Sequence, residues 1–335
     1  LQSNSALLAS LDCIGALAQL AHKNNYVRPI FNTEKRIDIK NGRHPVIEMR
    51  LGAAQKYTPN DTLLDANAQQ IQIITGPNMA GKSAYLRQTG IICLMAQIGS
   101  FVPAESADVC ILEKIFTRVG ATDNISSGES TFMVEMNETA SIMNNISENN
   151  LILLDEIGRG TSTFDGISIA WALAEYLHAH VHQPLTLFAT HYHELNELAE
   201  TLVRVKNVHA ATREVNNKII FLHKIVEGGS EHSFGVHVAR MAGMPQHITK
   251  RATELLHQFE NQADERIENK KINKSAVSKE TLRQVAYEKS MQLSFFSIDD
   301  PRLQRIKDAL DAMDLNSTTP VELMMKVYEW KKMLE

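Results

Sequence analysis

Apolar residues recur at helical spacing in some segments of the chain and form short continuous runs in others. Helical spacing predicts helices over 5–22, 83–95, 131–147 and 166–178, and the apolar runs predict strands over 71–75, 114–119, 151–155 and 185–190. The first helix should end near Lys23-Asn24-Asn25, where the apolar positions stop. Because the apolar runs alternate with helices, we expect an α/β domain whose central strands are buried and parallel.

Two dipeptides that favour turns interrupt alternating segments and predict hairpins. Residues 36–49 read as two short strands around Asn41-Gly42. Residues 205–212 and 218–225 flank Asn216-Asn217 and read as a hairpin that closes the sheet. The predicted sheet is therefore mixed.

The character of the chain changes after residue 230. Helical patterns over 234–241 and 247–259 flank Gly243-Met244-Pro245, which predicts a helix-turn-helix. The second helix carries charges of both signs and an apolar face, so contact with protein, as a dimerisation element, is favoured over a helix that reads the major groove of DNA. Residues 261–290 are polar with little periodicity, as in a linker, and apolar spacing returns after Pro301 in two short helices. These helices are too small to be stable alone and should oligomerise.

Five segments follow from this pattern. They are an entering helix over 1–25, an α/β domain over 26–229, the helix-turn-helix over 230–260, a linker over 261–290 and a tail over 291–335. The chain begins inside a helix without Met, and we interpret it as part of something longer.

Composition narrows the class of protein. The 335 residues carry a formal net charge of −5 with 44% hydrophobic residues, so a large core is expected and no overall basic field indicates nucleic acid. Cys13, Cys93 and Cys110 lack the spacing of metal ligands and lie in or beside apolar stretches, which predicts buried thiols in a reducing compartment. We find no apolar run long enough to span a bilayer and no signal peptide, so we expect a soluble, cytoplasmic chain.

The candidate chemistry begins with a glycine-rich loop between the strand over 71–75 and the helix that follows it. The loop consists of Gly76, Pro77, Asn78, Met79, Ala80, Gly81, Lys82 and Ser83, and it matches the phosphate-binding pattern of nucleotide hydrolases. Backbone N–H groups in such a loop point at phosphate oxygens, and the start of the helix supports them. Lys82 should neutralise the β- and γ-phosphates, and Ser83 should offer its hydroxyl to Mg²⁺.

A pair of carboxylates ends the apolar run over 151–155. Asp155 is placed to hold the same Mg²⁺ from its own strand. Glu156 lies one residue further and can polarise a water for attack on the γ-phosphate, which a passive nucleotide binder would not need. We therefore predict an ATPase with ATP and Mg²⁺ as its cofactors.

Four motifs carry a resemblance to one family. They are the phosphate loop from Thr75, the run Ser-Thr-Phe-Met-Val-Glu-Met over 130–136, the stretch Asp-Glu-Ile-Gly-Arg-Gly-Thr-Ser-Thr over 155–163, and Ala-Thr-His-Tyr over 189–192. In this order they resemble the ATPase domain of the MutS family of DNA mismatch-repair proteins. The resemblance implies a fold related to the ATPases of ABC transporters, in which two domains pair head to tail. It also implies that each ATP lies between the phosphate loop of one chain and the signature segment of the other.

The resemblance assigns further site residues. Ser130 would reach the γ-phosphate in trans, Asn78 would lie at the same junction, and His191 would contact the γ-phosphate from the end of its strand, although a buried, hydrogen-bonded histidine is the alternative. Tyr57 resembles the aromatic residue that stacks on adenine, but it could equally pack at the domain edge. Glu129 is a departure, since some relatives carry a basic residue before the signature serine.

Two other features depend on short patterns. His178, His180, His182 and His193 do not have spacing that gives metal coordination geometry by itself, so we expect no metal there. The peptide Gln292–Phe296 resembles the motif by which repair proteins dock on the sliding clamp, with the tail's own core as the alternative.

The function expected from the resemblance is ATP hydrolysis that couples mismatch recognition to conformational switching and to recruitment of repair partners, including a MutL-type protein. A homodimer is implied, with a possible tetramer through the tail, mismatched DNA as a ligand of the longer protein, DNA-modulated hydrolysis and no membrane. Three alternatives remain open: a nucleotide-holding dimerisation module without turnover, a MutS relative that acts on other DNA structures, and a transporter ATPase. Glu156 argues against the first, the absence of a nuclease pattern after residue 260 against the second, and the signature run against the third.

Overall fold

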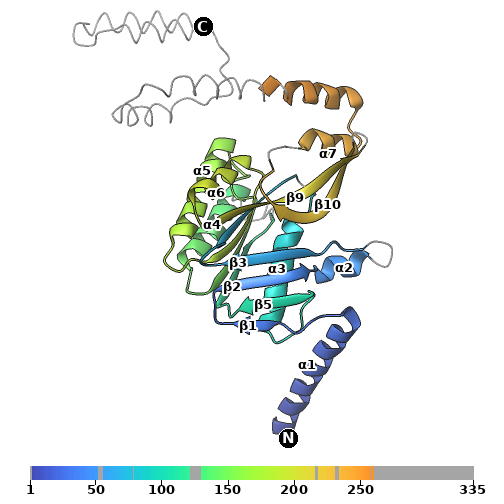
Figure 1. The fold of residues 1–335 in the computed structure, drawn as a ribbon, viewed down its shortest axis with the longest axis vertical. Coiled ribbons are helices and arrows are strands. Elements are labelled where there is room, and N and C mark those ends of the chain that lie inside the picture. Colours follow the sequence, from blue (N-terminus) through green and yellow to red (C-terminus); the bar gives the residue numbers. More distant parts are fainter. Residues whose placement is uncertain are drawn as a thin grey trace, which may run out of the picture. The chain divides into compact units, whose positions relative to one another are not determined.

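The computed structural model describes residues 2–51, 56–77, 79–120, 130–215, 218–230, 234–256 and 258–259. Asn78, Glu129, the predicted linker, the Gln292–Phe296 peptide and the tail helices lie outside the described residues. The chain divides into two compact units, Leu1–Thr253 and Glu254–Glu335, and the labelled helices and strands all belong to the first (Figure 1).

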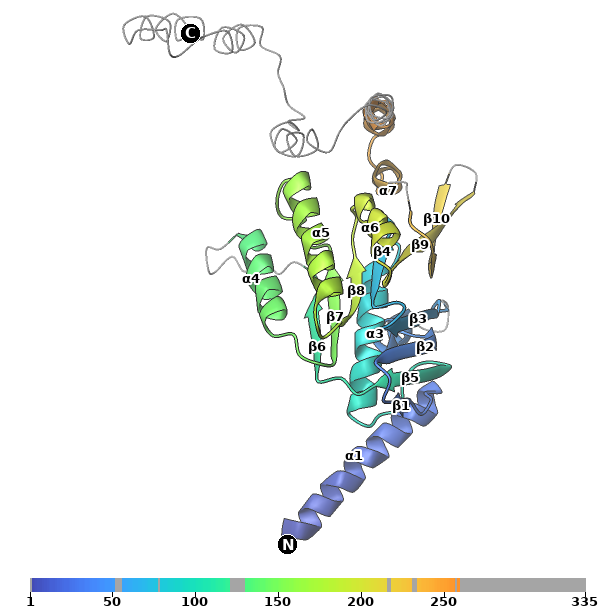
Figure 2. The same cartoon turned by 60° about the vertical axis from the view of Figure 1, so that its left-hand side comes forward.

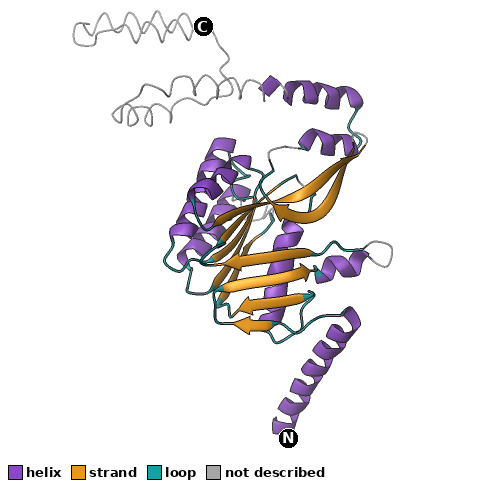
Figure 3. Cartoon of the chain, in the orientation of Figure 1, coloured by secondary structure: helices purple, strands orange, loops and turns teal. Residues whose placement is uncertain are grey.

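The first unit is built from both strands and helices (Figure 3). The strands are β1 (Ile30–Asn32), β2 (Arg36–Gly42), β3 (Asn60–Asp65), β4 (Ile71–Thr75), β5 (Ser106–Cys110), β6 (Lys114–Arg118), β7 (Asn150–Asp155), β8 (Leu185–Ala189), β9 (Val205–Val215) and β10 (Lys218–Glu227). The helices are α1 (Gln2–Asn24), α2 (Pro45–Leu51), α3 (Lys82–Gln97), α4 (Thr131–Asn144), α5 (Thr163–Ala179), the 3₁₀ helix η2 (His193–Glu197), α6 (Leu198–Thr201) and α7 (Gly235–Met241). A further helix runs over 246–256.

The larger sheet has six strands in the order β10-β9-β4-β8-β7-β6. Its strands from β9 to β6 are parallel, and β10 pairs antiparallel with β9. Since β4 lies between β8 and β9 and β7 lies next to β8, the ends of β4, β7 and β8 meet at one edge. The phosphate loop, Asp155 and His191 all follow these ends, which is the usual place for a ligand site in an open α/β sheet.

Helix α3 lies between the two sheets (Figure 2). Its buried side chains, including Tyr85, Leu86 and Ile92, share one apolar cluster with Ile37 of the small sheet and Leu153 of the large sheet. Helices α4, α5 and α6 cover the opposite face of the large sheet, where alternate residues of its strands point. The strand that carries Asp155 is therefore buried on both faces, as its apolar run predicts.

The smaller sheet, in the order β1-β5-β2-β3, corrects one prediction. Residues 36–49 do not form a hairpin: the strand continues to Gly42, with a register shift after Ile39, and a helix begins at Pro45. Proline has no N–H for a strand ladder but suits the first turn of a helix. The ring of His44 accepts a hydrogen bond from the N–H of Ile47 and so helps to start that helix.

The other predicted elements are confirmed within the described residues. Helix α4 ends three residues before the predicted boundary at 147, and β9 and β10 form the expected antiparallel pair, with Asn216 and Asn217 outside the description. Helix α7 and a helix over 246–256 occur where helical patterns were predicted, and their arrangement as a helix-turn-helix and its use in dimerisation remain predictions.

Two expectations about exposure and length are wrong. Cys93 and Cys110 are buried, but Cys13 is exposed, because it lies on the open face of α1. Helix α1 is also long and apolar enough, by length and composition alone, to count as a candidate membrane span, contrary to the expectation of no such run. One helix of this kind near an N-terminus is only weak evidence of a membrane-spanning segment.

Candidate nucleotide site at the ends of the parallel strands

The phosphate loop joins β4 to α3 and begins with a glycine that the fold requires. Gly76 has a φ of 127°, and a Cβ there would lie 3.2 Å from the backbone nitrogen of Ala210 on β9. Gly81, with a φ of 101°, is the N-cap of α3 and provides no side-chain cap. The first N–H groups of this 16-residue helix are therefore available to an anion.

Lys82 is folded into the loop. The residue is only 4% exposed, and its Nζ donates hydrogen bonds to the carbonyl oxygens of Gly76 at 2.5 Å and Pro77 at 3.2 Å. Burial lowers the pKa of Lys82, and the nearby carboxylates of Glu156 and Asp155 oppose this shift. The ammonium group thus lies within the loop where phosphate oxygens would replace carbonyl partners.

Asp155 lies at the end of β7, close to Ser83 at the start of α3. Burial raises the pKa of Asp155 above its usual range, and the Ser83 hydroxyl is near enough to offset part of that rise. The Oδ1 atom of Asp155 is buried and has no hydrogen-bond partner. Because a buried carboxylate oxygen normally has a partner, this atom and the Ser83 hydroxyl fit an oxygen-ligated cation such as Mg²⁺.

Glu156 has an unusual backbone conformation. Its φ is 54°, in the left-handed region that residues other than glycine rarely adopt, and its N–H donates to the carbonyl oxygen of Ala189 at 2.9 Å. The carboxylate forms an ion pair with Arg159, whose Nη1 lies 2.5 Å away. Arg159 is not among the predicted site residues, because its place in the run over 155–163 does not by itself indicate a contact with Glu156.

One cavity of about 780 Å³ connects these groups. Seven of the residues predicted for the site line it: Tyr57, Pro77, Met79, Gly81, Lys82, Ser83 and Glu156. Gly76, Ala80 and Asp155 lie directly beside them in the chain but do not line the cavity. The volume suits a ligand of nucleotide size.

Tyr57, which precedes β3, and His223, which lies within β10, line the same cavity. Burial raises the pKa of Tyr57 to about 12, and its hydroxyl donates to Gln88 at 2.9 Å. His223 lies in a bulge of β10, where the side chain of Asn60 donates to its carbonyl oxygen at 2.9 Å. The sequence analysis missed His223, since an apolar strand pattern does not indicate a bulge that long-range contacts create.

Ser130 and His191 lie outside the lining of this cavity. Ser130 is exposed and caps α4, because its Oγ accepts the N–H of Met133 at 3.1 Å. The ring of His191 packs against Tyr192 with centroids 4.1 Å apart. Partial burial lowers the pKa of His191, and Glu156 opposes that shift while Arg159 and Lys82 reinforce it, so these side chains are its charged neighbours.

The histidines after α5 do not form a metal-like cluster in the described part of the chain. No group of three or more His, Cys, Asp or Glu side chains with ligand geometry occurs among the residues that the structure describes. The rings of His180 and His182 lie 5.4 Å apart, and His180 also contacts Tyr176 edge to face.

Comparison with known proteins identifies the family. The family model for MutS domain V matches residues 72–260. The protein named DNA mismatch repair protein MutS from Phocaeicola vulgatus is 54% identical over 100% of this chain and 38% of its own length. The proteins of that name from Bacteroides thetaiotaomicron and Flavobacterium psychrophilum are each 55% identical, over 100% and 99% of this chain and 38% and 37% of their own lengths. This chain thus spans less than two fifths of the length of these relatives. Since the family model covers more than half of the residues, the resemblance is confirmed and the chain belongs to the MutS family.

Proposed function

We propose that this chain binds ATP with Mg²⁺ and hydrolyses it, as the ATPase part of a DNA mismatch-repair protein. The observation that carries the proposal is the meeting of Lys82, Ser83 and Glu156 in one cavity, beside a buried Asp155 oxygen that has no partner. This one site would bind a cation and a phosphate chain and would supply a base that activates water.

The chain's own groups have distinct roles in the proposed reaction. The start of α3 and the ammonium group of Lys82 neutralise the phosphates, and Lys82 exchanges its bonds to the carbonyls of Gly76 and Pro77 for phosphate oxygens. Ser83 and Asp155 would hold Mg²⁺, which when bound supplies positive charge to the β- and γ-phosphates.

Glu156 is the proposed base. Its carboxylate lines the cavity and its side chain is 18% exposed, so a water can reach it. The carboxylate orients that water and accepts its proton as the water oxygen bonds to the γ-phosphorus, while the bond from that phosphorus to the β–γ bridging oxygen breaks and ADP leaves. Arg159 binds one oxygen of this carboxylate, Oε2, and so competes with the water for that oxygen.

The adenine ring is proposed to lie against Tyr57. The ring of Tyr57 and the imidazole of His223 line one cavity, and both offer flat faces to a purine. His223 is held in place because Asn60 accepts the N–H of Ile225 at 2.8 Å and donates to the carbonyl of His223.

A homodimer completes the proposed site. Ser130 caps a 14-residue helix, is exposed and lies away from its own chain's cavity, so it is available to the γ-phosphate bound by a second chain. His191 and Asn78 are proposed to contact the γ-phosphate from their own chain, with Asn78 outside the described residues.

The wider role follows from the family and is also proposed. The relatives are named DNA mismatch repair proteins, which suggests mismatched DNA as the ligand that modulates hydrolysis, a MutL-type partner and a cytoplasmic location. Docking on the sliding clamp through Gln292–Phe296 and tetramer formation through the tail concern residues outside the description. We assign no DNA-binding surface to this chain itself, in keeping with its net charge of −5.

Phosphate release tests the proposal. The wild-type chain should release phosphate from ATP in the presence of Mg²⁺, Glu156→Gln should bind ATP but release about 100-fold less, and the exposed control Glu200→Gln should match wild type. Normal ATP binding with no phosphate release by the wild type would instead support the nucleotide-holding module, in which Arg159 keeps Glu156 occupied.

A further inference from the structure

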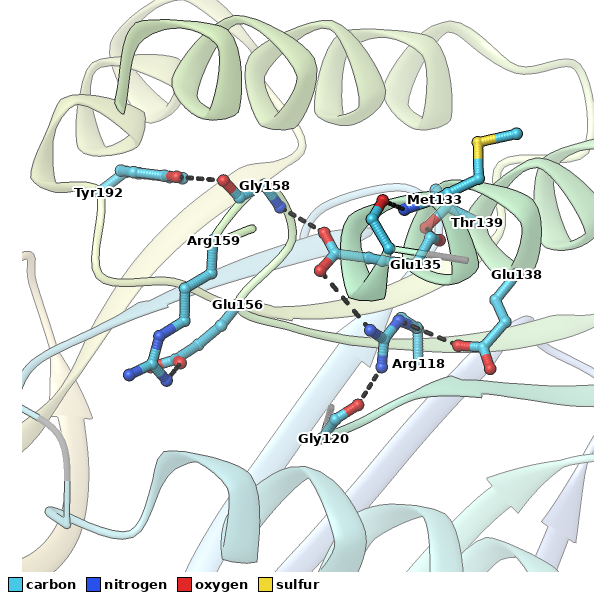
Figure 4. Close-up of polar contacts among 11 residues, drawn as sticks. Arg118, Gly120, Met133, Glu135, Glu138, Thr139, Glu156, Gly158, Arg159 and Tyr192 are labelled. Atoms are coloured by element: carbon cyan, nitrogen blue, oxygen red, sulfur yellow. Dashed lines mark hydrogen bonds and ion pairs between the residues drawn. The ribbon is translucent and has the colours of Figure 1, made fainter. Parts of the chain in front are cut away.

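The peptide backbone at Gly158 is held from both sides (Figure 4). Its N–H donates to Oε1 of Glu135, on α4, at 2.6 Å. Its carbonyl oxygen accepts the hydroxyl of Tyr192 at 2.8 Å. Gly158 follows the proposed base Glu156 by two residues, so these contacts set the position of the loop that carries the base.

The loop around Gly158 packs closely against its neighbours, with no room for a side chain at its glycines. A Cβ at Gly158 would lie 2.6 Å from Cα of Gly166, and one at Gly166 would lie 2.1 Å from the hydroxyl oxygen of Tyr192. A Cβ at Gly160 would lie 3.0 Å from Cβ of Phe132, in the first turn of α4. The start of α4 and the loop after Glu156 are therefore in direct contact at two points, Phe132 with Gly160 and Glu135 with Gly158.

Glu135 uses both of its carboxylate oxygens. Oε1 receives the N–H of Gly158, and Oε2 lies 3.5 Å from Nη2 of Arg118, at the end of β6. The two ionic side chains are only 9% and 7% exposed. A glutamine at position 135 has one acceptor oxygen and could serve only one of these donors. The ion pair with Arg118 fixes the carboxylate, and the carboxylate in turn fixes the loop.

Glu138 pairs with the same arginine as Glu135 but does not contact the loop at Gly158. Its Oε2 lies 3.0 Å from Nε of the same Arg118, but its side chain is 46% exposed, and Figure 4 marks no contact between it and Gly158. Glu138 is therefore the natural control for Glu135, since both are acidic residues of α4 that pair with one arginine.

Ser130 and Glu135 belong to one rigid element. Ser130 caps α4, and Glu135 lies about one and a half turns further along the same helix. A pull on Ser130 from a bound phosphate therefore moves the carboxylate that holds Gly158. The bond between Glu135 and Gly158 joins a charged acceptor to a backbone donor, so it resists separation more than a neutral hydrogen bond would.

We propose that Glu135 is a positioning residue that couples the two ATP sites of the dimer. A partner's γ-phosphate that binds Ser130 shifts α4, Glu135 moves Gly158 with it, and the carboxylate of Glu156 is brought into line in the chain's own cavity. Tyr192 extends the same link to His191, its neighbour in the chain. The inference rests on the proposed function, because it needs Ser130 to act in trans and Glu156 to act as the base. Coupling of this kind requires an element with two positions that both sites bias, and we assign this role to α4 with its attached loop.

The test is a double-mutant cycle on the 335-residue chain. Ser130→Ala is combined with Glu135→Gln and, separately, with the control Glu138→Gln, and each variant is measured for the affinity of a fluorescent ATP analogue and for kcat. We expect Glu135→Gln to keep ATP affinity within about twofold of the control but to lower kcat by about tenfold or more. Ser130→Ala should then lower kcat strongly in the Glu138→Gln background and by a clearly smaller factor in the Glu135→Gln background, where only the direct contact of Ser130 with phosphate is left to lose.

Two outcomes overturn the coupling and are distinguishable. If Ser130→Ala lowers kcat by the same factor in both backgrounds, the shared site stands but Glu135 does not couple it. If Ser130→Ala has no effect on the wild-type chain, the proposed shared site fails and the coupling fails with it. Tyr192→Phe, which removes one hydroxyl and keeps the ring, serves as a second probe where Glu135→Gln lowers the melting temperature, and it should show the same loss of dependence on Ser130.

Discussion

The guanidinium of Arg159 lies 2.5 Å from the carboxylate of Glu156, the proposed base, while Arg159 itself is 64% exposed. An ion pair with such an exposed partner stabilises the fold by at most about 1 kcal/mol. It nevertheless occupies the carboxylate of Glu156. We predict that Arg159→Ala leaves the melting temperature unchanged and raises kcat by up to about fivefold, since Glu156 no longer has to leave a partner. The exposed Arg213→Ala is the control, and thermal unfolding with phosphate release measures both effects. A fall in kcat of more than about tenfold would show that Arg159 serves the bound nucleotide directly.

Asp155 gives a prediction with a definite sign. Burial raises its pKa in the folded chain, so ionised Asp155 destabilises the fold at any pH above that raised value, and this cost disappears as the pH falls through it. At neutral pH without Mg²⁺ and nucleotide, Asp155→Asn should therefore raise the melting temperature. Adding Mg²⁺ and ATP should stabilise the wild-type chain and leave Asp155→Asn unaffected. Thermal unfolding with and without Mg²⁺ and ATP measures this, with the exposed Asp12→Asn as the control.

The raised pKa of Asp155 also predicts the pH dependence of Mg²⁺ binding. Because protons compete with the cation for Asp155 and its pKa is raised, Mg²⁺-dependent binding of ATP should weaken at a higher pH than an ordinary carboxylate would give. Equal pH dependence in the presence and absence of Mg²⁺ would contradict this role for Asp155.

Tyr57 separates stacking from hydrogen bonding. Tyr57→Phe keeps the ring and loses only the bond to Gln88, so ATP affinity should change by less than about threefold. Tyr57→Ala removes the aromatic face and should weaken ATP binding by about 5- to 150-fold, the range for one stacked base. Titration of a fluorescent ATP analogue measures both variants. Equal losses in the two variants would place adenine elsewhere and make Tyr57 a residue of the domain edge.

Gly166 tests the close packing behind the site. A Cβ at Gly166 would lie 2.1 Å from the hydroxyl oxygen of Tyr192 and 2.4 Å from the carbonyl oxygen of Gly158, so Gly166→Ala should lower the free energy of unfolding by about 2–3 kcal/mol. Gly15→Ala is the matched control in another helix. Nothing lies within 4 Å of its Cβ position, and that variant should stabilise the chain by about 0.5–1 kcal/mol. Urea unfolding followed by circular dichroism measures both changes.

The sequence predicts the parts of this fold that depend on local pattern. The apolar run over 151–155 and the glycines of the loop from Gly76 require a buried strand and a tight turn wherever they occur, and both are present. The prediction for residues 36–49 failed because Asn41-Gly42 suits a bulge as well as a turn, and Pro45 was not recognised as a helix start.

The remaining site features depend on contacts between distant segments. His223 faces the cavity because Asn60, far away in the chain, holds the β10 bulge. Glu135 appears in the sequence only as part of a signature run, and its contact with Gly158 becomes visible when α4 is placed against the loop after β7. No spacing rule predicts such contacts, because the intervening chain of about twenty residues can pack in many ways.

The most direct test of the central claim is steady-state ATP hydrolysis across a series of protein concentrations, with Ser130→Ala and Glu156→Ala measured alongside the wild type. A site shared between two chains predicts that turnover per wild-type chain rises with concentration and is lost in both variants. Turnover per chain that is independent of concentration and of Ser130 would contradict the shared site.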